Sequence, residues 1–494
     1  MRFPIVSLSI LHFNPKLYLA LAFLLPFSVR ALPEILMREY IVGFDTISYY
    51  VPVAWKWVNF GVNFWKFFGY APLFYLLLSG LTLVGIPLTV SLKVLPPFLH
   101  GFLGLAIFGY AVKSLDWSYV RGLFVSSLAT LYFVGLRISW DMLRSELGLI
   151  FFFAFLIALK SYLSDSIWKM FTLLLSSAVL VALSHQLVSI VMFAVVLAVA
   201  LEKMLNRHVF MVLRLFSAVL PAMLLFGLTV YADYVILPVF SEDAATSGRL
   251  MWLTLLSYSS AFDGIANTIG FILFCYLPLL PFIVLGMQNL NCLELKAWSI
   301  WCLAGVAIPF FFSNAPLVYR WILLLVFPFS FFAVEGFKKV KFGLSKKVLV
   351  GFATVLSFSF VFLPAEAAFP YFRLYPYYVP SSMLQNSVPL SDCSDVVAAL
   401  NWARDNVGSS GALMVHDAFY GWVTLYDDGI KILRYGYAPP RESALKFFGE
   451  GYSPLLLVWW VNGEGWHGQV SLPSSFNEVF HSGRIAVYKF EAQV

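Results

Sequence analysis

Three residues of this 494-residue chain combine a reactive side chain with an unusual place in an apolar sequence. Asp45 follows the first long apolar run, Asp141 interrupts a later one, and Arg320 opens one of the last runs. A carboxylate can act as a general base or a metal ligand, and a guanidinium group can hold a phosphate. An arginine in an apolar segment is costly, which makes Arg320 a functional hypothesis by default. Solvated loop carboxylates and an arginine that reaches the membrane interface are the plain alternatives.

Four charged residues interrupt the apolar pattern around position 141. Arg137 and Arg144 stand on either side of Asp141, and Glu146 follows. Carboxylate oxygens suit hard cations, so Asp45, Asp141 and Glu146 form a candidate site for Mg²⁺ or Mn²⁺. Guanidinium groups suit phosphate, which makes Arg137 or Arg144 a candidate ligand for a phosphorylated substrate. A loop with local ion pairs beside a helix start is the alternative interpretation.

Two further segments carry polar residues between apolar runs. His185 stands between two such runs, and Tyr319 directly precedes Arg320. We expect His185 to contact a phosphate or an acceptor, and a plain interfacial position is the alternative. The outer loop 232–263 combines acidic residues with small ones. This composition suits a mobile flap over a site as well as an ordinary hydrophilic loop.

The composition excludes most other classes of protein. Hydrophobic residues make up 61% of the chain and charged residues 12%, and the mean hydropathy is +0.84. A soluble domain carries about 25% charged residues, so a soluble enzyme and a disordered chain are both excluded. The pattern is typical of a polytopic helical membrane protein. The sequence contains no P-loop, HExxH or GxSxG motif, so ATP-driven transport and zinc or serine hydrolysis are unsupported.

The positions of Lys and Arg predict how the chain crosses the membrane. Basic residues favour cytoplasmic loops, and they gather at 338–347, at 203–214 and near the N-terminus. Twelve apolar runs approach the length of a span. The basic clusters can all lie on the cytoplasmic side only if one of these runs does not cross the membrane. We therefore expect about 11 spans, plus one re-entrant or partial segment among 72–90, 95–113 and 118–137.

This order of spans has a consequence for the candidate residues. The N-terminus becomes cytoplasmic and the C-terminal part becomes extracytoplasmic, in a multi-pass protein of the cell membrane. The loops around Asp45, Asp141, His185 and Arg320 then all lie on the outer side.

The chain divides by composition into a membrane part and a soluble part. Residues 1–364 hold the apolar runs and include a long outer loop at 34–71, whose aromatic and Lys residues are typical of an interfacial helix. Residues 365–391 are rich in Pro and Tyr, and we expect a linker at the membrane surface. Residues 392–494 predict a small α/β domain from short apolar runs between turn signals. The expected fold is thus an all-α polytopic membrane domain with a small C-terminal extracytoplasmic α/β domain.

The order of these features resembles a known family. The first outer loop holds Gly43-x-Asp45-x-x-x-Tyr49, and Ala71-Pro72-Leu73-Phe74-Tyr75 and Ser139-Trp140-Asp141 follow before the late Arg320. Over most of the chain this order resembles the GT-C superfamily of membrane glycosyltransferases, in particular prokaryotic and archaeal relatives of the protein mannosyltransferases. The oligosaccharyltransferase branch carries WWDYG, where this tail has Trp459-Trp460-Val461-Asn462-Gly463, so that branch is not assigned.

The resemblance implies an activity and roles for the candidate residues. It implies transfer of a sugar from a polyprenyl-phosphate donor, such as a dolichyl-phosphate sugar, at the outer membrane face. Asp45 and Asp141 would be catalytic, in an inverting displacement. The resemblance implies that Arg320 engages the lipid phosphate. By their own chemistry and position, His185, Arg137 and Tyr319 are further candidates for binding the lipid phosphate and donor. The implied partners are the lipid-linked donor, membrane lipids and a protein, lipid or glycan acceptor, and not nucleic acid.

Two other classes of function fit the composition. A transporter or lipid flippase would place charged residues near the middle of its spans and show paired inverted halves. A non-catalytic membrane scaffold with an outer binding domain would need neither. The charges stand at the ends of the apolar runs and no internal repeat is visible, which favours the glycosyltransferase.

Overall fold

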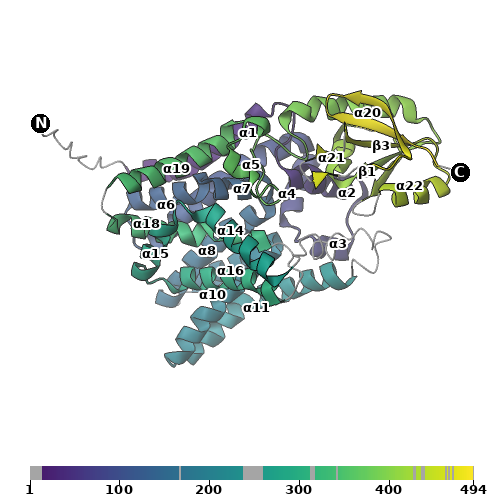
Figure 1. Cartoon of the computed structure of the whole chain (residues 1–494). Helices are drawn as coiled ribbons and strands as arrows, with labels where there is room; N and C mark the ends of the chain where they lie inside the picture. Colours follow the sequence, from purple (N-terminus) through teal and green to yellow (C-terminus); the bar gives the residue numbers. More distant parts are fainter. Residues whose placement is uncertain are drawn as a thin grey trace, which may run out of the picture.

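The computed structural model of the chain is mostly helical, with a small sheet region near its C-terminus (Figure 1). It describes residues 14–165, 168–236, 260–311, 318–340, 343–426, 430–435, 440–461, 464–465, 468–469 and 472–492. Most of the outer loop 232–263 lies outside the described residues.

The helical part begins at α1 and ends at α19. Its helices are α1 (Pro15–Leu36), η1 (Thr46–Tyr50), α2 (Val51–Phe60), α3 (Phe64–Gly69), α4 (Leu73–Leu83), α5 (Leu88–Ser114), α6 (Tyr119–Leu131), α7 (Phe133–Asp141), α8 (Leu143–Asp165), α9 (Trp168–Ser184), α10 (Gln186–Leu205), α11 (Val209–Tyr231), η2 (Ala232–Ile236), α14 (Ala261–Tyr276), α15 (Leu280–Asn289), α16 (Leu293–Phe311), α17 (Val318–Leu324), α18 (Val326–Lys339) and α19 (Leu344–Phe362).

Several of these helices suit a membrane by length and composition. In the described part of the chain, 7 stretches are long and apolar enough to cross: α1, α5, most of α8, α10, α11, the α17–α18 stretch and α19. The bent pairs α6–α7, at 59°, and α14–α15, at 88°, raise the number to 9 if each pair is one span. The chain is therefore a multi-pass membrane protein, and the count of about 11 spans stays a prediction.

The three segments among which one was expected not to cross differ in length. α4 has 11 residues and so extends about 16 Å, roughly half of a 30 Å hydrocarbon core. α5 has 27 residues, and α6–α7 is long enough although it is bent. By length, α4 best fits the partial segment.

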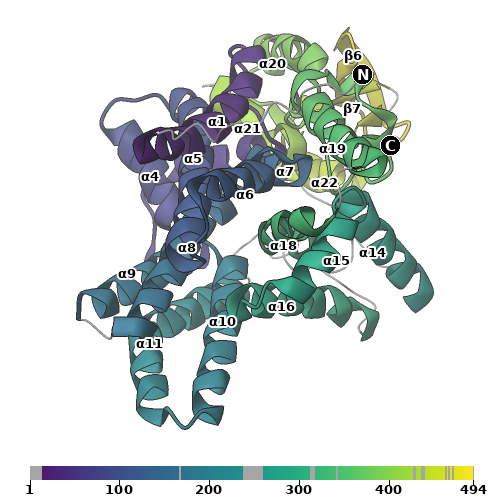
Figure 2. The same cartoon turned by 90° about the vertical axis from the view of Figure 1, so that its left-hand side faces the viewer.

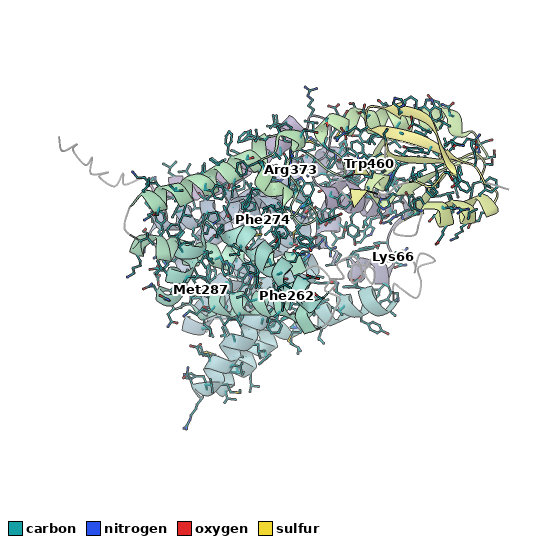
Figure 3. All side chains as sticks on the ribbon, viewed as in Figure 1. Lys66, Phe262, Phe274, Met287, Arg373 and Trp460 are labelled. Atoms are coloured by element: carbon teal, nitrogen blue, oxygen red, sulfur yellow. The ribbon has the colours of Figure 1, made fainter. Side chains whose placement is uncertain are left out.

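Close helix crossings in the membrane part depend on small residues, because lipid offers no hydrophobic drive for helix association. At the crossing of α15 and α18, a Cβ added to Gly286 would overlap the backbone of Phe332. Conversely, a Cβ added to Gly336 of α18 would overlap the backbone of Phe282 of α15. The two helices lie side by side in Figure 2. Figure 3 places Phe274 of α14 within the helical part.

The C-terminal part is a sheet with helices. Its five strands lie in the order β2 (Ile432–Tyr435), β1 (Ala412–His416), β3 (Leu455–Trp460), β7 (Ile485–Phe490) and β6 (Phe476–Ser482). β1 pairs in parallel with β2 and β3, whereas β7 is antiparallel to β3 and β6. The helices are α20 (Cys393–Val407), α21 (Asp417–Tyr426) and α22 (Pro440–Gly449), and a separate two-stranded ribbon joins β4 (Glu464–Gly465) to β5 (Gly468–Gln469). Every residue of β3 is buried, as in a strand covered on both faces.

The segment between α19 and α20 is irregular and largely internal. It contains three short 3₁₀ turns: η3 (Ala365–Ala367), η4 (Pro370–Arg373) and η5 (Leu390–Asp392). Residues 378–388 are buried, apart from a partly exposed Ser381. This stretch, which we call the inner linker, runs between the helical part and the C-terminal domain. Its main-chain groups bond to the helical part, and the Ser387 hydroxyl accepts a hydrogen bond from Trp422 of the C-terminal domain.

Candidate active site

Asp45 owes its position to the glycine two residues before it. Gly43 has φ = +98°, a conformation that disfavours any side chain. A Cβ there would overlap the carbonyl oxygen of Trp140 and would lie 3.1 Å from Cβ of Asp141. The absence of a side chain at Gly43 therefore lets the Asp45 segment approach the end of α7.

Asp45 and Arg320 meet although 275 positions separate them in the sequence. Nη2 of Arg320 donates to Oδ2 of Asp45 at 3.1 Å, and Nε of Arg320 donates to the hydroxyl of Tyr319 at 3.2 Å. The Tyr319 ring stacks on Tyr378 of the inner linker, with 5.3 Å between the ring centroids. Both members of the ion pair remain partly exposed, at 17% for Arg320 and 21% for Asp45. Both side chains are therefore partly accessible from outside the protein.

Asp141, the last residue of α7, brings a second carboxylate to the same place. Nη1 of Arg137, one helical turn earlier, donates to Oδ1 of Asp141. Nε of Arg137 donates to the carbonyl oxygen of Tyr378 at 2.8 Å, which fixes the arginine against the inner linker. Arg137 and Asp141 are both almost fully buried, so this pair is held more rigidly than the Arg320 pair.

The electrostatics of Asp45 suit a proton acceptor. Burial, followed by the nearby charge of Asp141, raises the pKa of Asp45 to about 6. The cations Arg320, Arg137 and Arg144 act in the opposite direction. A carboxylate with a pKa close to neutrality can both take up and release a proton under physiological conditions.

His185 lies close to the cations of this site. Its Nε2 and the hydroxyl of Ser145 lie 3.1 Å apart. Burial, with further contributions from Arg144 and Arg320, lowers the pKa of His185 well below its usual value, so the ring is neutral. The next residue, Gln186, donates to Oδ2 of Asp233 at 3.1 Å. A neutral imidazole beside two arginines can serve as a hydrogen-bond partner without adding charge.

Tyrosines cover the side of the site next to Arg144. The guanidinium group of Arg144 lies 5.6 Å from the ring centroid of Tyr75. Tyr49 contacts Tyr70 and Tyr75 edge to face, at 6.1 and 6.5 Å between ring centroids. The motif segments 43–49 and 71–75 of the sequence thus meet at one wall.

Glu146 lies apart from the two aspartates. It is fully buried on α8, and its Oε1 lies 2.5 Å from Nδ1 of an equally buried His100. The other ring nitrogen of His100 lies 3.0 Å from the carbonyl oxygen of Thr130. Among the described residues, no three His, Cys, Asp or Glu side chains form a group that could hold a metal ion. In this arrangement Asp45 and Asp141 are each paired with an arginine.

Arg30 is a residue of this region that the sequence alone did not identify as functional. It is completely buried on α1, where Nη1 lies 2.8 Å from Oε1 of Glu34. Its Nε donates to the carbonyl oxygen of Ser139 at 2.9 Å and so ties α1 to α7, two residues before Asp141. An arginine within an apolar run was the available signal.

A notch of about 340 Å³ lies outside this site, between α1 and α5. Apolar residues such as Phe27 and Phe98 line it, with Glu34, Arg38 and Lys93 at one end. Nζ of Lys93 lies 3.6 Å from Oε2 of Glu34. The notch contains none of the site residues predicted from the sequence.

The chain is similar in fold to a membrane protein of known structure. No protein-family model matches the chain, and the comparison with curated proteins finds no match. The crystal structure of ArnT from Cupriavidus metallidurans bound to undecaprenyl phosphate is similar in fold, with a TM-score of 0.55. The likeness covers 97% of this chain and 98% of the ArnT chain, at 13% sequence identity. This chain therefore has an ArnT-like membrane fold over nearly its whole length.

Proposed function

We propose that this protein is a glycosyltransferase that moves a sugar from a polyprenyl-phosphate donor to an acceptor hydroxyl. The observation that carries the proposal is the partly exposed contact between Arg320 and Asp45, with Asp141 nearby. A phosphate-binding cation beside a proton-accepting carboxylate is what such a transfer needs. The ArnT-like fold adds support, because the ArnT structure contains undecaprenyl phosphate, which is itself a polyprenyl phosphate.

The proposed reaction is a single inverting displacement. The acceptor oxygen forms a bond to the anomeric carbon of the sugar while the bond from that carbon to the phosphate oxygen breaks. Asp45 accepts the proton of the acceptor hydroxyl, and the electron pair of the broken bond leaves with the polyprenyl phosphate. Arg320 has five N–H donors, so it can contact Asp45, Tyr319 and a departing phosphate oxygen together.

The remaining residues of the site have supporting roles in this proposal. Arg137 holds Asp141 in place, and the Asp141 charge keeps the pKa of Asp45 close to neutrality. Arg144 and the neutral His185 provide a further cation and a hydrogen-bond partner for the donor phosphate. A requirement for Mg²⁺ or Mn²⁺ is left to experiment, and no step of the reaction needs the ion.

The test of this function is binding and turnover of defined donors by the purified full-length protein. A panel of polyprenyl-phosphate sugars would be screened by thermal shift and then by sugar transfer. We expect one donor to stabilise the protein, and Arg320→Ala to lose this stabilisation. Arg404→Ala is the matched control, because Arg404 is an exposed arginine of the C-terminal domain. Stabilisation and transfer that persist in Arg320→Ala would contradict the role of Arg320.

The proposed alternatives predict different results in the same material. A transporter or flippase would move the lipid-linked sugar across a proteoliposome membrane without transferring it to an acceptor. A scaffold would show neither donor binding nor movement. Either result would overturn the glycosyltransferase proposal.

We place the site on the outer side of the membrane, with a cytoplasmic N-terminus. The clusters of basic residues support this orientation. Since Cys275, Cys292, Cys302 and Cys393 are all buried, labelling with a membrane-impermeant thiol reagent would report introduced cysteines. Ser410→Cys in the C-terminal domain should react in intact cells, and Lys338→Cys should react only after permeabilisation. The reverse pattern would invert the topology.

A further inference from the structure

Helix α21 of the C-terminal domain packs directly on η1, the turn that follows Asp45. The closest approach is made by Gly421, and a Cβ added there would overlap the carbonyl group of Ile47. Ile47 stands two residues after Asp45, within the same turn of backbone. A helix of the soluble domain thus touches the main chain that carries the proposed base. Figure 1 shows α21 beside α2, where the helical part meets the sheet.

Contacts on both sides of Gly421 hold α21 in this position. The Trp422 ring lies 5.8 Å from the ring of Tyr40, and its Nε1 donates to the hydroxyl of Ser387 at 2.9 Å. On the other side, Nζ of Lys56 lies 5.5 Å from the ring centroid of Tyr420. α21 is therefore fastened to the chain before Asp45, to the helix after it and to the inner linker.

The inner linker ties together the two segments that carry the carboxylates. The carbonyl oxygen of Gln385 accepts hydrogen bonds from the N–H of Gly43 and from Nε1 of Trp140, each at 3.1 Å. The side-chain amide of Asn386 donates to the carbonyl oxygen of Ile41 at 2.9 Å. One main-chain acceptor thus fixes the backbone before Asp45 against the residue before Asp141.

We propose that α21 is a positioning element for Asp45, and that Gly421 is the residue through which it acts. α21 packs against η1, and the inner linker is hydrogen-bonded to the preceding backbone. Together these contacts fix the position of the Asp45 carboxylate beside Arg320. The soluble domain then helps to position a residue of the site in the membrane domain. The catalytic consequence rests on the proposed function, but the packing between the two parts does not.

Gly421→Ala tests this proposal with little risk to the fold of α21. Alanine is a better helix former than glycine, so the substitution favours the helix and disturbs only its contact with Ile47. Gly449→Ala, on α22 of the same domain, is the matched control, because a Cβ at Gly449 meets no atom within 4 Å. Both variants would be made in the full chain.

Two measurements decide the outcome. In Gly421→Ala we expect the amides of 46–50 to exchange hydrogen at least about tenfold faster, with protection in β1 and β3 unchanged. We expect kcat for transfer to fall by about 10²-fold at an unchanged KM for the donor, because a small misplacement of a reacting group has this effect. Gly449→Ala should leave both values within about twofold.

Unchanged exchange at 46–50 in Gly421→Ala would overturn the proposal. Faster exchange with an unchanged kcat would overturn the catalytic part of it. If the wild-type protein transfers no sugar, the proposed function fails, while hydrogen exchange still decides whether α21 positions the Asp45 segment. If β1 and β3 lose protection in Gly421→Ala, the exchange experiment is repeated with Trp422→Phe in its place. This variant removes the hydrogen bond to Ser387, and unchanged exchange at 46–50 would again overturn the proposal.

Discussion

Two arginine–carboxylate pairs of this protein have similar geometry and different surroundings. Arg30 and Glu34 lie 2.8 Å apart with 0% and 5% of their side chains exposed, whereas Arg320 and Asp45 lie 3.1 Å apart with 17% and 21% exposed. A fully buried pair cannot exchange a partner for a substrate, because either charge left alone would be desolvated without compensation. A partly open pair can. Exposure therefore separates an ion pair that holds helices together from one suited to chemistry.

Removing the base from the open pair should have the largest effect on activity. Asp45→Asn keeps the shape of the side chain but cannot accept the acceptor proton, so we expect kcat to fall about 10²–10⁴-fold. Initial rates of sugar transfer at saturating donor would measure this, with donor binding retained. Asp405→Asn, at an exposed carboxylate of α20, should leave the rate unchanged. Full activity of Asp45→Asn would remove Asp45 from the mechanism.

Breaking the buried pair should instead reduce stability. Arg30→Met removes the hydrogen bond to Ser139 and one of the two cations beside Glu34, while Lys93 remains 3.6 Å away. We therefore expect a loss of stability below the about 3–5 kcal/mol that an uncompensated buried charge costs. Thermal unfolding in detergent would show a lowered Tm that donor cannot restore. Arg320→Met should lower Tm less, because Asp45 keeps access to water. Equal losses in the two variants would abolish the distinction between the pairs.

The pH dependence of sugar transfer should follow the ionisation of Asp45 in the partly exposed pair. Because the pKa of Asp45 is raised to about 6, the base is mostly ionised at pH 7 and mostly protonated at pH 5. We expect kcat to fall about tenfold between these values, since the protonated carboxyl cannot accept a proton. Removing the Asp141 charge makes ionisation of Asp45 easier, so Asp141→Asn should move the acidic limb to lower pH. A shift of this limb to higher pH would contradict the coupling.

Chelation should have the smallest effect. Asp45 and Asp141 are each occupied by an arginine, so we expect unchanged transfer rates after treatment with EDTA. Activity lost to EDTA and restored by Mg²⁺ or Mn²⁺ would show that the carboxylates change partners on substrate binding. Such a result would mean that the contact between Arg320 and Asp45 is broken more easily than its geometry in this structure indicates.

The sequence predicted that Asp45 and Arg320 lie on one side better than it predicted which residues each of them contacts. Counting spans put Asp45 and Arg320 on one side, but a pairing across 275 positions depends on how the helices pack, which no local pattern contains. Glu146 was grouped with Asp141 because they are near in sequence. The helix breaks at Met142, so α7 and α8 present the two carboxylates in different directions, and Glu146 meets His100 instead.

The fold was predictable at the level of classes. Apolar runs indicate a helical membrane part and turn signals indicate a small α/β domain, and both are present. The aromatic residues Trp422 and Trp459 of that domain are buried in its core. Gly85, at φ = +92° just after the end of α4, lies within the apolar run 72–90, so glycines and prolines in the sequence indicated an interruption there but not which of the three runs is short. Composition could not reveal the role of 378–388, because much of that role is carried by the main-chain carbonyl groups of Tyr378 and Gln385.

The main-chain carbonyl oxygen of Gln385 accepts two hydrogen bonds, and this has an evolutionary consequence. Every amino acid presents the same carbonyl group, so substitution at position 385 can preserve the link between Gly43 and Trp140 as long as the new side chain fits. Relatives of this protein can then share the link while differing freely at that position. We expect selection to be visible at its donors, where a glycine and an indole N–H are required, and to be faint at its acceptor.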